Sequence, residues 1–140
     1  GTSNLWFAMI PSLYRLNLDK NHLDTFKINV SFDLGDCYTK VFDSIAWIST
    51  NNGLIRYNLS SDAFVHYNSS DGLADNNVNG VYPDVHGNIW ITSLKGLTRM
   101  EVESETTETF FRSNDFLSLH FIKPHYRHPQ YKHRLHAPVY

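Results

Sequence analysis

The sequence predicts an all-β fold built from about three repeated units, each made of four short antiparallel strands. Two observations support this prediction. Four residue types recur at fixed spacings in three registers, and short segments of alternating apolar and polar residues are separated by turns rich in Asn, Asp, Gly and Ser. A repeat of this length indicates that one supersecondary motif is stacked several times along the chain.

The repeat is marked by the three tryptophans of the chain, Trp6, Trp47 and Trp90, which lie 41 and 43 residues apart. A leucine follows each tryptophan after seven residues, an arginine after nine and an aromatic residue after twenty. These residues are Leu13, Leu54 and Leu97; Arg15, Arg56 and Arg99; and Phe26, Tyr67 and Phe110. We expect the tryptophans and leucines to pack between stacked units, and the arginines to make the same structural contact in each unit.

The second repeat shows its four strands most clearly. "IAWIST" (45–50) is apolar and β-branched like a buried strand, and "LIRYNL" (54–59) follows it after the turn "NNG", whose residues tolerate positive φ. "AFVHY" (63–67) and "VNGVYPD" (78–84) complete the unit. Four strands in 41 to 43 residues is the size of one β-propeller blade. The predicted fold is therefore a partial β-propeller of about three four-stranded antiparallel blades.

The blades are expected within residues 1–118, and their boundaries and the tail follow from the spacing of the motifs. The connection between the first two repeats is two residues shorter than the next one, which predicts a tight Asp43–Ser44 hairpin. After "NDFLS" the expected fourth strand does not follow, and we predict an irregular tail rich in His and Pro over 119–140. The three repeats are expected at about 4–44, 45–87 and 88–118.

Composition excludes several function classes. Of 140 residues, 41% are hydrophobic and 19% are charged, which suits a packed core. The formal net charge of −2 gives no electrostatic reason to expect nucleic-acid or anionic-membrane binding. A single cysteine, Cys37, excludes an intramolecular disulfide. The start "GTSNLWF" shows no signal peptide, and we interpret the chain as a fragment whose natural start has been removed.

Two segments carry a family resemblance. "GNIWITSLKGLTRM" (87–100) and "IAWISTNNGLIRYN" (45–58) resemble the two-component regulator propeller repeat. That repeat has a G-x-I-W-I-G-T strand, a G-L-x-R-[YFM] strand, an aromatic strand and a D-G-L-x-x-N loop. The loop is matched here by "DGLADNNVNGVYPD" (71–84). The resemblance covers roughly residues 4 to 118 and is strongest from 45 to 111.

The resemblance implies a function. Such repeats typically form propellers outside the inner membrane that sense carbohydrate fragments, and a membrane helix connects them to a histidine kinase, a receiver and a DNA-binding domain. By this resemblance the chain is a periplasmic fragment of a ligand-sensing propeller that provides signal input to a two-component histidine kinase. It implies no catalytic activity and no cofactor. The implied partners are an oligosaccharide or other small ligand, the remaining blades and the C-terminal signalling domains, with no nucleic acid.

Two alternatives remain open. One is a propeller domain of a secreted polysaccharide lyase or glycosidase, which needs catalytic His, Tyr or carboxylate side chains in a central cleft. The other is a structural propeller that binds proteins. In all cases three blades do not close a ring, so we expect the isolated chain to be marginally stable or to form a homo-oligomer through its open ends.

Other candidate sites have simpler interpretations. The pairs His125/His128 and His133/His136 have metal-ligand spacing but no nearby carboxylate or thiolate, which favours an unstructured basic tail over a metal site. Two groups of carboxylates are interpreted as solvated turns or loops rather than as acid–base or calcium sites: Glu101, Glu103, Glu105 and Glu108; and Asp71, Asp75 and Asp84. The long loop 68–77 is the natural candidate for ligand contacts, although the sequence does not identify binding residues.

Overall fold

The computed structural model describes residues 3–9, 11–28, 30, 35, 37–112, 119–126 and 134–136. Within them, the strands are β1 (Asn4–Met9), β2 (Ser12–Asn17), β3 (His22–Lys27), β4 (Tyr38–Phe42), β5 (Ile45–Thr50), β6 (Gly53–Asn58), β7 (Ala63–Tyr67), β8 (Val78–Pro83), β9 (Asn88–Ser93), β10 (Gly96–Glu101), β11 (Thr106–Arg112), β12 (Leu119–Tyr126) and β13 (Arg134–His136). One short 3₁₀ helix, η1 (Ser69–Asp71), lies in the loop between β7 and β8.

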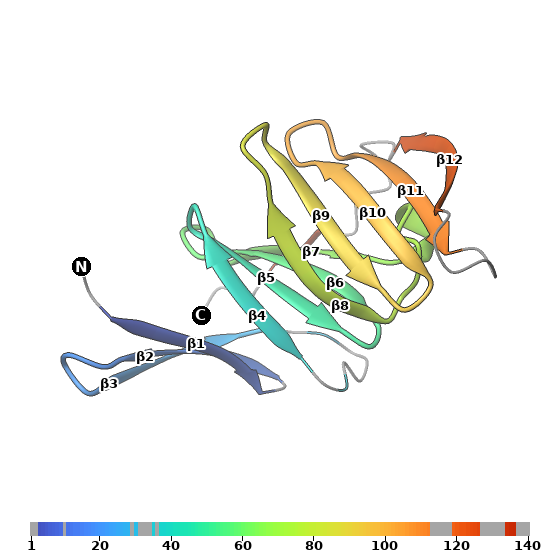
Figure 1. Ribbon diagram of the computed structural model, residues 1–140. Coiled ribbons are helices and arrows are strands. Elements are labelled where there is room, and N and C mark those ends of the chain that lie inside the picture. Colours follow the sequence, from blue (N-terminus) through green and yellow to red (C-terminus); the bar gives the residue numbers. More distant parts are fainter. Residues whose placement is uncertain are drawn as a thin grey trace.

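The strands form three antiparallel sheets that are stacked one after another (Figure 1). Sheet 1 contains β1, β2 and β3, sheet 2 contains β4 to β7, and sheet 3 contains β8 to β11, with neighbours in chain order. The prediction of an all-β fold with antiparallel, blade-like sheets is confirmed. Over the described residues the sheets do not close into a ring.

Two further strands lie in the C-terminal segment. β12 pairs with β11 and adds to the outer edge of sheet 3, and β13 pairs with β7 at the outer edge of sheet 2. The prediction of an irregular tail is therefore wrong for residues 119–126 and 134–136. The physical reason is that β7 and β11 are edge strands, whose unpaired N–H and C=O groups accept a partner strand of almost any sequence.

The sheets are offset by one strand from the sequence repeats. The tryptophan strands β5 and β9 come second in their sheets, because β4 and β8, which end the preceding repeats, form hairpins with them. Sheets 2 and 3 are thus each assembled from two successive repeats. Sheet 1 begins directly with its tryptophan strand, β1.

The spacing of the repeated residues follows from strand register. Each tryptophan is directly opposite the arginine nine residues later, as Trp47 is opposite Arg56. Each leucine is opposite the aromatic residue of the next strand, as Leu54 is opposite Tyr67. The same pairs occur at the equivalent positions of sheets 1 and 3. Cross-strand neighbours of this kind stabilise antiparallel sheets.

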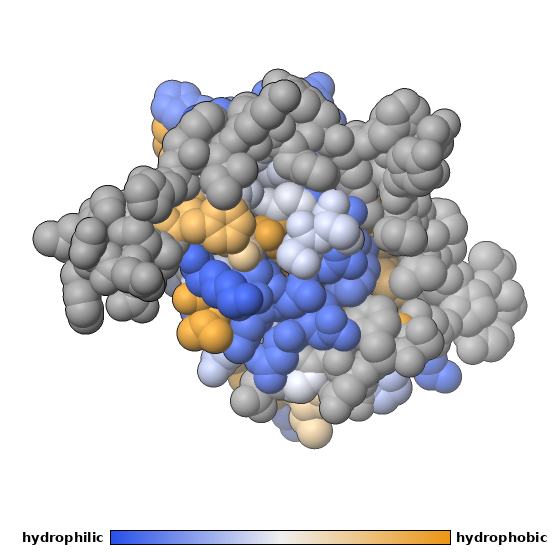
Figure 2. Space-filling model, turned by 90° about the vertical axis from the view of Figure 1, so that its right-hand side faces the viewer, coloured by the Kyte–Doolittle hydropathy of each residue, from blue (hydrophilic) through white to orange (hydrophobic). Residues whose placement is uncertain are grey.

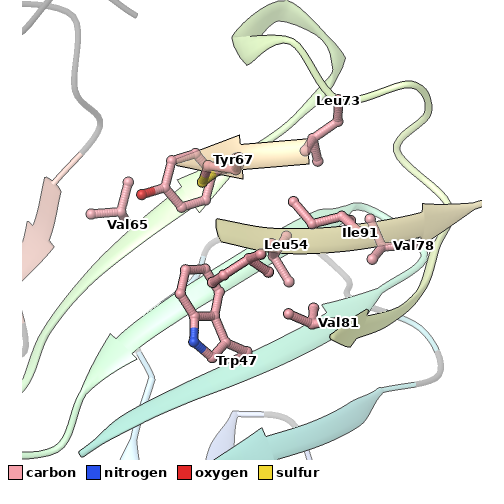
Figure 3. Close-up of a cluster of buried hydrophobic side chains, with 10 residues drawn as sticks. Trp47, Leu54, Val65, Tyr67, Leu73, Val78, Val81 and Ile91 are labelled. Atoms are coloured by element: carbon pink, nitrogen blue, oxygen red, sulfur yellow. The ribbon is translucent and has the colours of Figure 1, made fainter. Parts of the chain in front are cut away.

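Two hydrophobic clusters hold the sheets together. Between sheets 1 and 2, Leu13 packs with Ile48 and Phe64. We call the face of a sheet that lies against the preceding sheet its first face. Between sheets 2 and 3, Trp47 and Leu54 pack with residues of sheet 3 such as Ile91 (Figure 3). Sheet 2 is thus covered on both faces, which explains why residues 45–48 of β5 are all apolar rather than alternating.

The short connection between β4 and β5 is the predicted hairpin. Phe42 is opposite Ile45, and the two residues between them, Asp43 and Ser44, have φ values of 51° and 59°. Positive φ at both central residues is the signature of a type I′ turn, whose twist matches that of the flanking strands. The prediction of a tight Asp43–Ser44 hairpin is confirmed.

The "NNG" turn between β5 and β6 depends on its glycine. The positive φ falls on Gly53, at 101°, and the two asparagines before it keep negative φ values. A Cβ at Gly53 would collide with the backbone carbonyl oxygen of Tyr67, and a Cβ at Gly96 would collide with that of Phe110. At both equivalent positions the fourth strand of the sheet, β7 or β11, passes too close for any side chain.

We predict that Gly53→Ala is markedly more destabilising than Gly87→Ala. Both glycines have positive φ, 101° and 83°, but a Cβ at Gly87 meets nothing within 4 Å. Gly87→Ala should lower the free energy of unfolding by about 1–2 kcal/mol from backbone conformation alone. Gly53→Ala adds a collision with backbone that cannot move away, and should cost about 3 kcal/mol. Urea unfolding of the two variants measures the difference, and equal losses would contradict the role of the close approach.

Candidate functional site

The candidate site is a groove between sheets 2 and 3, at the ends of the sheets that carry the β4–β5, β8–β9 and β10–β11 turns. A pocket of about 360 Å³ lies there, and its polar lining comes from Asp43, Arg56, Asp84 and Asn88. Phe42, Trp47 and Val102 are among its apolar lining residues. A neighbouring pocket of about 490 Å³ shares Arg56, Gly87 and Val102 with it. We call these two pockets together the inter-sheet groove.

Arginine and tryptophan form the same contact in all three sheets. The guanidinium carbon lies over the indole ring at 5.5 Å for Arg15 on Trp6, 5.7 Å for Arg56 on Trp47 and 6.0 Å for Arg99 on Trp90. A cation over an aromatic face at this distance contributes about 0.5–1 kcal/mol at exposed sites. Because the contact recurs, it belongs to the architecture of the sheets and does not by itself mark a site.

The acidic partner of this arginine differs in sheet 2. In sheet 1, Arg15 forms an ion pair with Asp24 on the neighbouring strand at 2.7 Å. In sheet 3, Arg99 forms the equivalent pair with Glu108 at 2.5 Å. The residue opposite Arg56 in sheet 2 is Val65, which carries no charge. Sheet 2 therefore lacks the carboxylate that its two neighbours place beside the arginine.

Arg56 instead faces a carboxylate from sheet 3. Its Nη1 lies 3.8 Å from Oε1 of Glu105, which belongs to the β10–β11 turn. The Tyr67 hydroxyl donates a hydrogen bond of 3.1 Å to the same oxygen. Burial, with the negative charge of Glu105 beside the ring, raises the pKa of Tyr67 far above its ordinary value. The phenol therefore remains a hydrogen-bond donor at any physiological pH.

Asp84 organises the β8–β9 turn at the edge of the groove. Its carboxylate accepts hydrogen bonds from the backbone N–H groups of His86 and Asn88 at 2.8 and 3.0 Å. The side-chain amide of Asn88 and Nε1 of Trp90 donate to it at 2.9 and 3.0 Å. These hydrogen bonds, with that from the Asn88 side chain the strongest, lower the pKa of Asp84 well below its ordinary value.

Trp47 lacks the acceptor that Asp84 gives to Trp90. The β4–β5 connection is two residues shorter than the β8–β9 connection, and no aspartate occupies the equivalent position. Trp47 is 1% exposed, and its buried Nε1 has no hydrogen-bond partner among the residues that the structure describes. A buried N–H without an acceptor costs about 1–3 kcal/mol.

The loop 68–77 lies at the opposite ends of the sheets and connects sheets 2 and 3. Asn68 caps η1, and its backbone N–H donates to Asp71, which completes a capping box. Leu73 and Ala74 are buried, and the Ala74 N–H donates to the Thr98 hydroxyl at 2.9 Å. The structure therefore places this loop as a tightly bonded connector and gives it no pocket among those described.

The sequence analysis interprets all of these acidic residues as solvated, but two of them are buried. Glu101 and Glu103 are exposed, but Glu105 is only 4% exposed and Asp71 only 9%. The interpretation of Glu105 and Asp71 as solvated residues is wrong. Both residues lie in connections between strands, where sequence alone suggests exposure. In the structure Glu105 faces Arg56 of sheet 2, and Asp71 takes part in the capping box of η1.

The histidines of the tail do not form a metal site within the part of the chain that the structure describes. His120 and His125 are on β12 and His136 is on β13, while His128 and His133 lie outside the described residues. Within the described part of the chain, no group of three His, Cys, Asp or Glu side chains is arranged to hold a metal ion. No helix there is both long and apolar enough to cross a membrane.

Comparison with known proteins gives no family assignment. No protein-family model matches the chain, and no curated protein matches it. The resemblance of the repeats to the two-component regulator propeller motif therefore rests on the quoted residues.

We predict that Asp84→Asn weakens the dependence of stability on acid pH. The pKa of Asp84 is lower in the folded chain than its unfolded value of about 3.9. Its contribution is therefore present above about pH 4 and is lost as the pH falls through the folded pKa. Thermal unfolding should show a lower Tm for the variant near pH 6, and a smaller further loss between pH 4 and pH 2 than for the unchanged chain. Parallel pH profiles for the two proteins would contradict this assignment.

Proposed function

We propose that the chain is part of a propeller-type, extracytoplasmic ligand sensor that provides signal input to a two-component histidine kinase. Its ligand is a carbohydrate or a similar small molecule, its location is the periplasm, and it performs no catalysis. In the complete sensor it acts with further blades and with C-terminal signalling domains. The net charge of −2 gives it no attraction for nucleic acid.

The repeated packing of the sheets supports the propeller part of this proposal. The face that carries Trp6 and Leu13 packs against the first face of sheet 2. The face that carries Trp47 and Leu54 packs in the same way against the first face of sheet 3. Successive sheets related by one repeated interface are the construction principle of a propeller.

The inter-sheet groove is the main structural support for the proposed sensor function. It combines an arginine, carboxylates, an amide and aromatic rings in a concave site between two rigid sheets, which is typical of small-molecule sites. The Asp84 carboxylate already accepts hydrogen bonds that hold the β8–β9 turn and Trp90, which favours a structural role over a catalytic one.

We predict that the chain binds neutral oligosaccharides without converting them. The test incubates the purified chain with a panel of neutral oligosaccharides and analyses the sugars by mass spectrometry, while calorimetry follows binding. Unchanged sugar masses together with measurable binding heat are the expected result. Cleaved or unsaturated products would support the glycosidase or lyase alternative instead.

One face of sheet 1 carries exposed apolar side chains, namely Leu5, Met9 and Leu23, which are 51, 63 and 49% exposed. Phe7 and Tyr14 stack beside them with ring centroids 5.2 Å apart. The equivalent faces of sheets 2 and 3 are buried against a preceding sheet. The described residues on the side seen in Figure 2 are, by contrast, mostly hydrophilic. We propose that a second copy of the chain covers this face of sheet 1 in solution.

We predict that the purified chain associates in a concentration-dependent way through this face. Light scattering should give a mass above the 16.2 kDa of one chain as the concentration rises. Leu5→Lys combined with Met9→Lys should reduce association by placing charges in the contact. Leu18→Lys is the matched control, because Leu18 is 58% exposed but lies in the β2–β3 turn. A monomer at every concentration would contradict the proposal.

A further inference from the structure

We propose that the inter-sheet groove binds one unit of a neutral, hydroxyl-rich ligand, a mono- or disaccharide, through Arg56, the indole N–H of Trp47 and the carboxylate of Asp43. This inference rests on the proposed function and assigns its site and ligand chemistry. Sheet 2 departs from the repeat at two positions that meet in one pocket.

Both departures concern hydrogen-bond donors that line this pocket. Arg15 and Arg99 have carboxylates opposite them at 2.7 and 2.5 Å, whereas Arg56 has Val65 opposite and reaches Glu105 at 3.8 Å. Trp90 donates to Asp84, whereas Nε1 of the almost fully buried Trp47 has no acceptor among the described residues. Trp47 and Arg56 line the same pocket. An acceptor on a ligand would give the Trp47 N–H the partner that Asp84 gives Trp90. Arg56, which already faces Glu105, would contribute a further N–H donor from the same wall.

The pocket has the size and the position that this ligand needs. Its volume of about 360 Å³ falls in the range of small-molecule sites, about 300–1,000 Å³. In Figure 3 the indole nitrogen of Trp47 lies on the side of the ring that faces away from Val81 and the apolar cluster.

The β4–β5 turn supplies the movement that ligand entry requires. The Trp47 nitrogen is covered in the structure as it stands, so an acceptor reaches it when a neighbouring element shifts. Asp43, which lines the pocket, and Ser44 both have positive φ, a conformation that costs non-glycine residues about 1 kcal/mol each or more. The proposal therefore requires this two-residue turn, which borders the pocket, to shift when the ligand enters.

The charges in the pocket select a neutral ligand. Arg56 and Trp47 donate hydrogen bonds, while Asp43 and Asp84 contribute two negative charges to the lining. An anion would be repelled by the two aspartates, and a simple cation would leave the Trp47 N–H without an acceptor. A hydroxyl group both donates and accepts, so neighbouring hydroxyls of one sugar ring can satisfy both kinds of group. Phe42 provides an apolar wall for the carbon face of the ring.

The first experiment follows the indole N–H resonances of the three tryptophans during titration with glucose, galactose, mannose and their disaccharides. Trp47→Phe assigns the Trp47 resonance. We expect at least one neutral sugar to shift that resonance strongly and saturably. Glucuronate and glucosamine test the charge argument, and each should bind at least tenfold more weakly than the matching neutral sugar.

Two matched glycine substitutions test the role of Asp43. Asp43→Gly and Ser44→Gly both relieve a positive φ, so both should leave the Tm unchanged or higher. Only Asp43→Gly removes the carboxylate, and it should weaken sugar binding at least tenfold, while Ser44→Gly keeps the affinity. Val65→Glu gives Arg56 the partner that Glu108 gives Arg99, and should also lower the affinity.

The outcomes separate the site from the function. A sugar that shifts the Trp6 or Trp90 resonance and leaves Trp47 unchanged overturns the site, while the sensor function stands. Equal affinity of Asp43→Gly and the unchanged chain overturns it in the same way. Tighter binding of glucuronate than of glucose overturns the neutral-ligand chemistry. If no neutral sugar binds to the folded chain, both the site and the carbohydrate-sensing function fail.

Discussion

The structure depends on one packing interaction, in which the tryptophan face of a sheet lies on the opposite face of the next sheet. Within the described chain this interaction occurs twice, and it buries Trp47, Leu54 and Ile55 to 1% exposure or less. Side chains buried to this extent provide the main favourable contribution to folding, about 25 cal/mol per Å² of apolar surface. A single sheet without a neighbour would leave these apolar faces in water, so no sheet is expected to be stable independently of the stack.

Strand exchange between repeats reinforces this dependence. β4 and β8 belong in sequence to one repeat and in space to the next, so the backbone hydrogen bonds of sheets 2 and 3 join adjacent repeats. The glycines at the β5–β6 and β9–β10 turns then let the fourth strand, β7 or β11, approach closely enough to complete each sheet. Local turn chemistry, register and sheet stacking therefore favour the same arrangement, which is the condition for one well-defined fold.

The sequence predicts features that are set by local spacing. The four strands of the second repeat and the Asp43–Ser44 turn follow from alternation and loop length, because those determine register in a hairpin. The sequence does not predict features that are set by contacts between distant parts of the chain. The burial of Glu105 depends on a turn of sheet 3 reaching Arg56 of sheet 2, and the pairing of β12 and β13 depends on which strand edges remain open. The inter-sheet groove is missed for the same reason, since it exists only when two sheets are stacked.

One signal for the groove is nevertheless present in the sequence. Aligning the repeats on their tryptophans places Asp24, Val65 and Glu108 at the same position, and it shows that the second repeat alone has a valine there. A repeated residue is explained by the architecture, because every sheet needs it. The loss of a repeated residue from one sheet is not explained by the architecture, because the other sheets keep that residue. In sheet 2, Val65 replaces the in-sheet partner of the arginine, and Arg56 faces Glu105 of sheet 3 instead. Trp47 has no acceptor among the described residues, and the two side chains line one pocket. Departures from an internal repeat are thus more informative about function than the repeat itself, and in this chain they coincide between sheets 2 and 3.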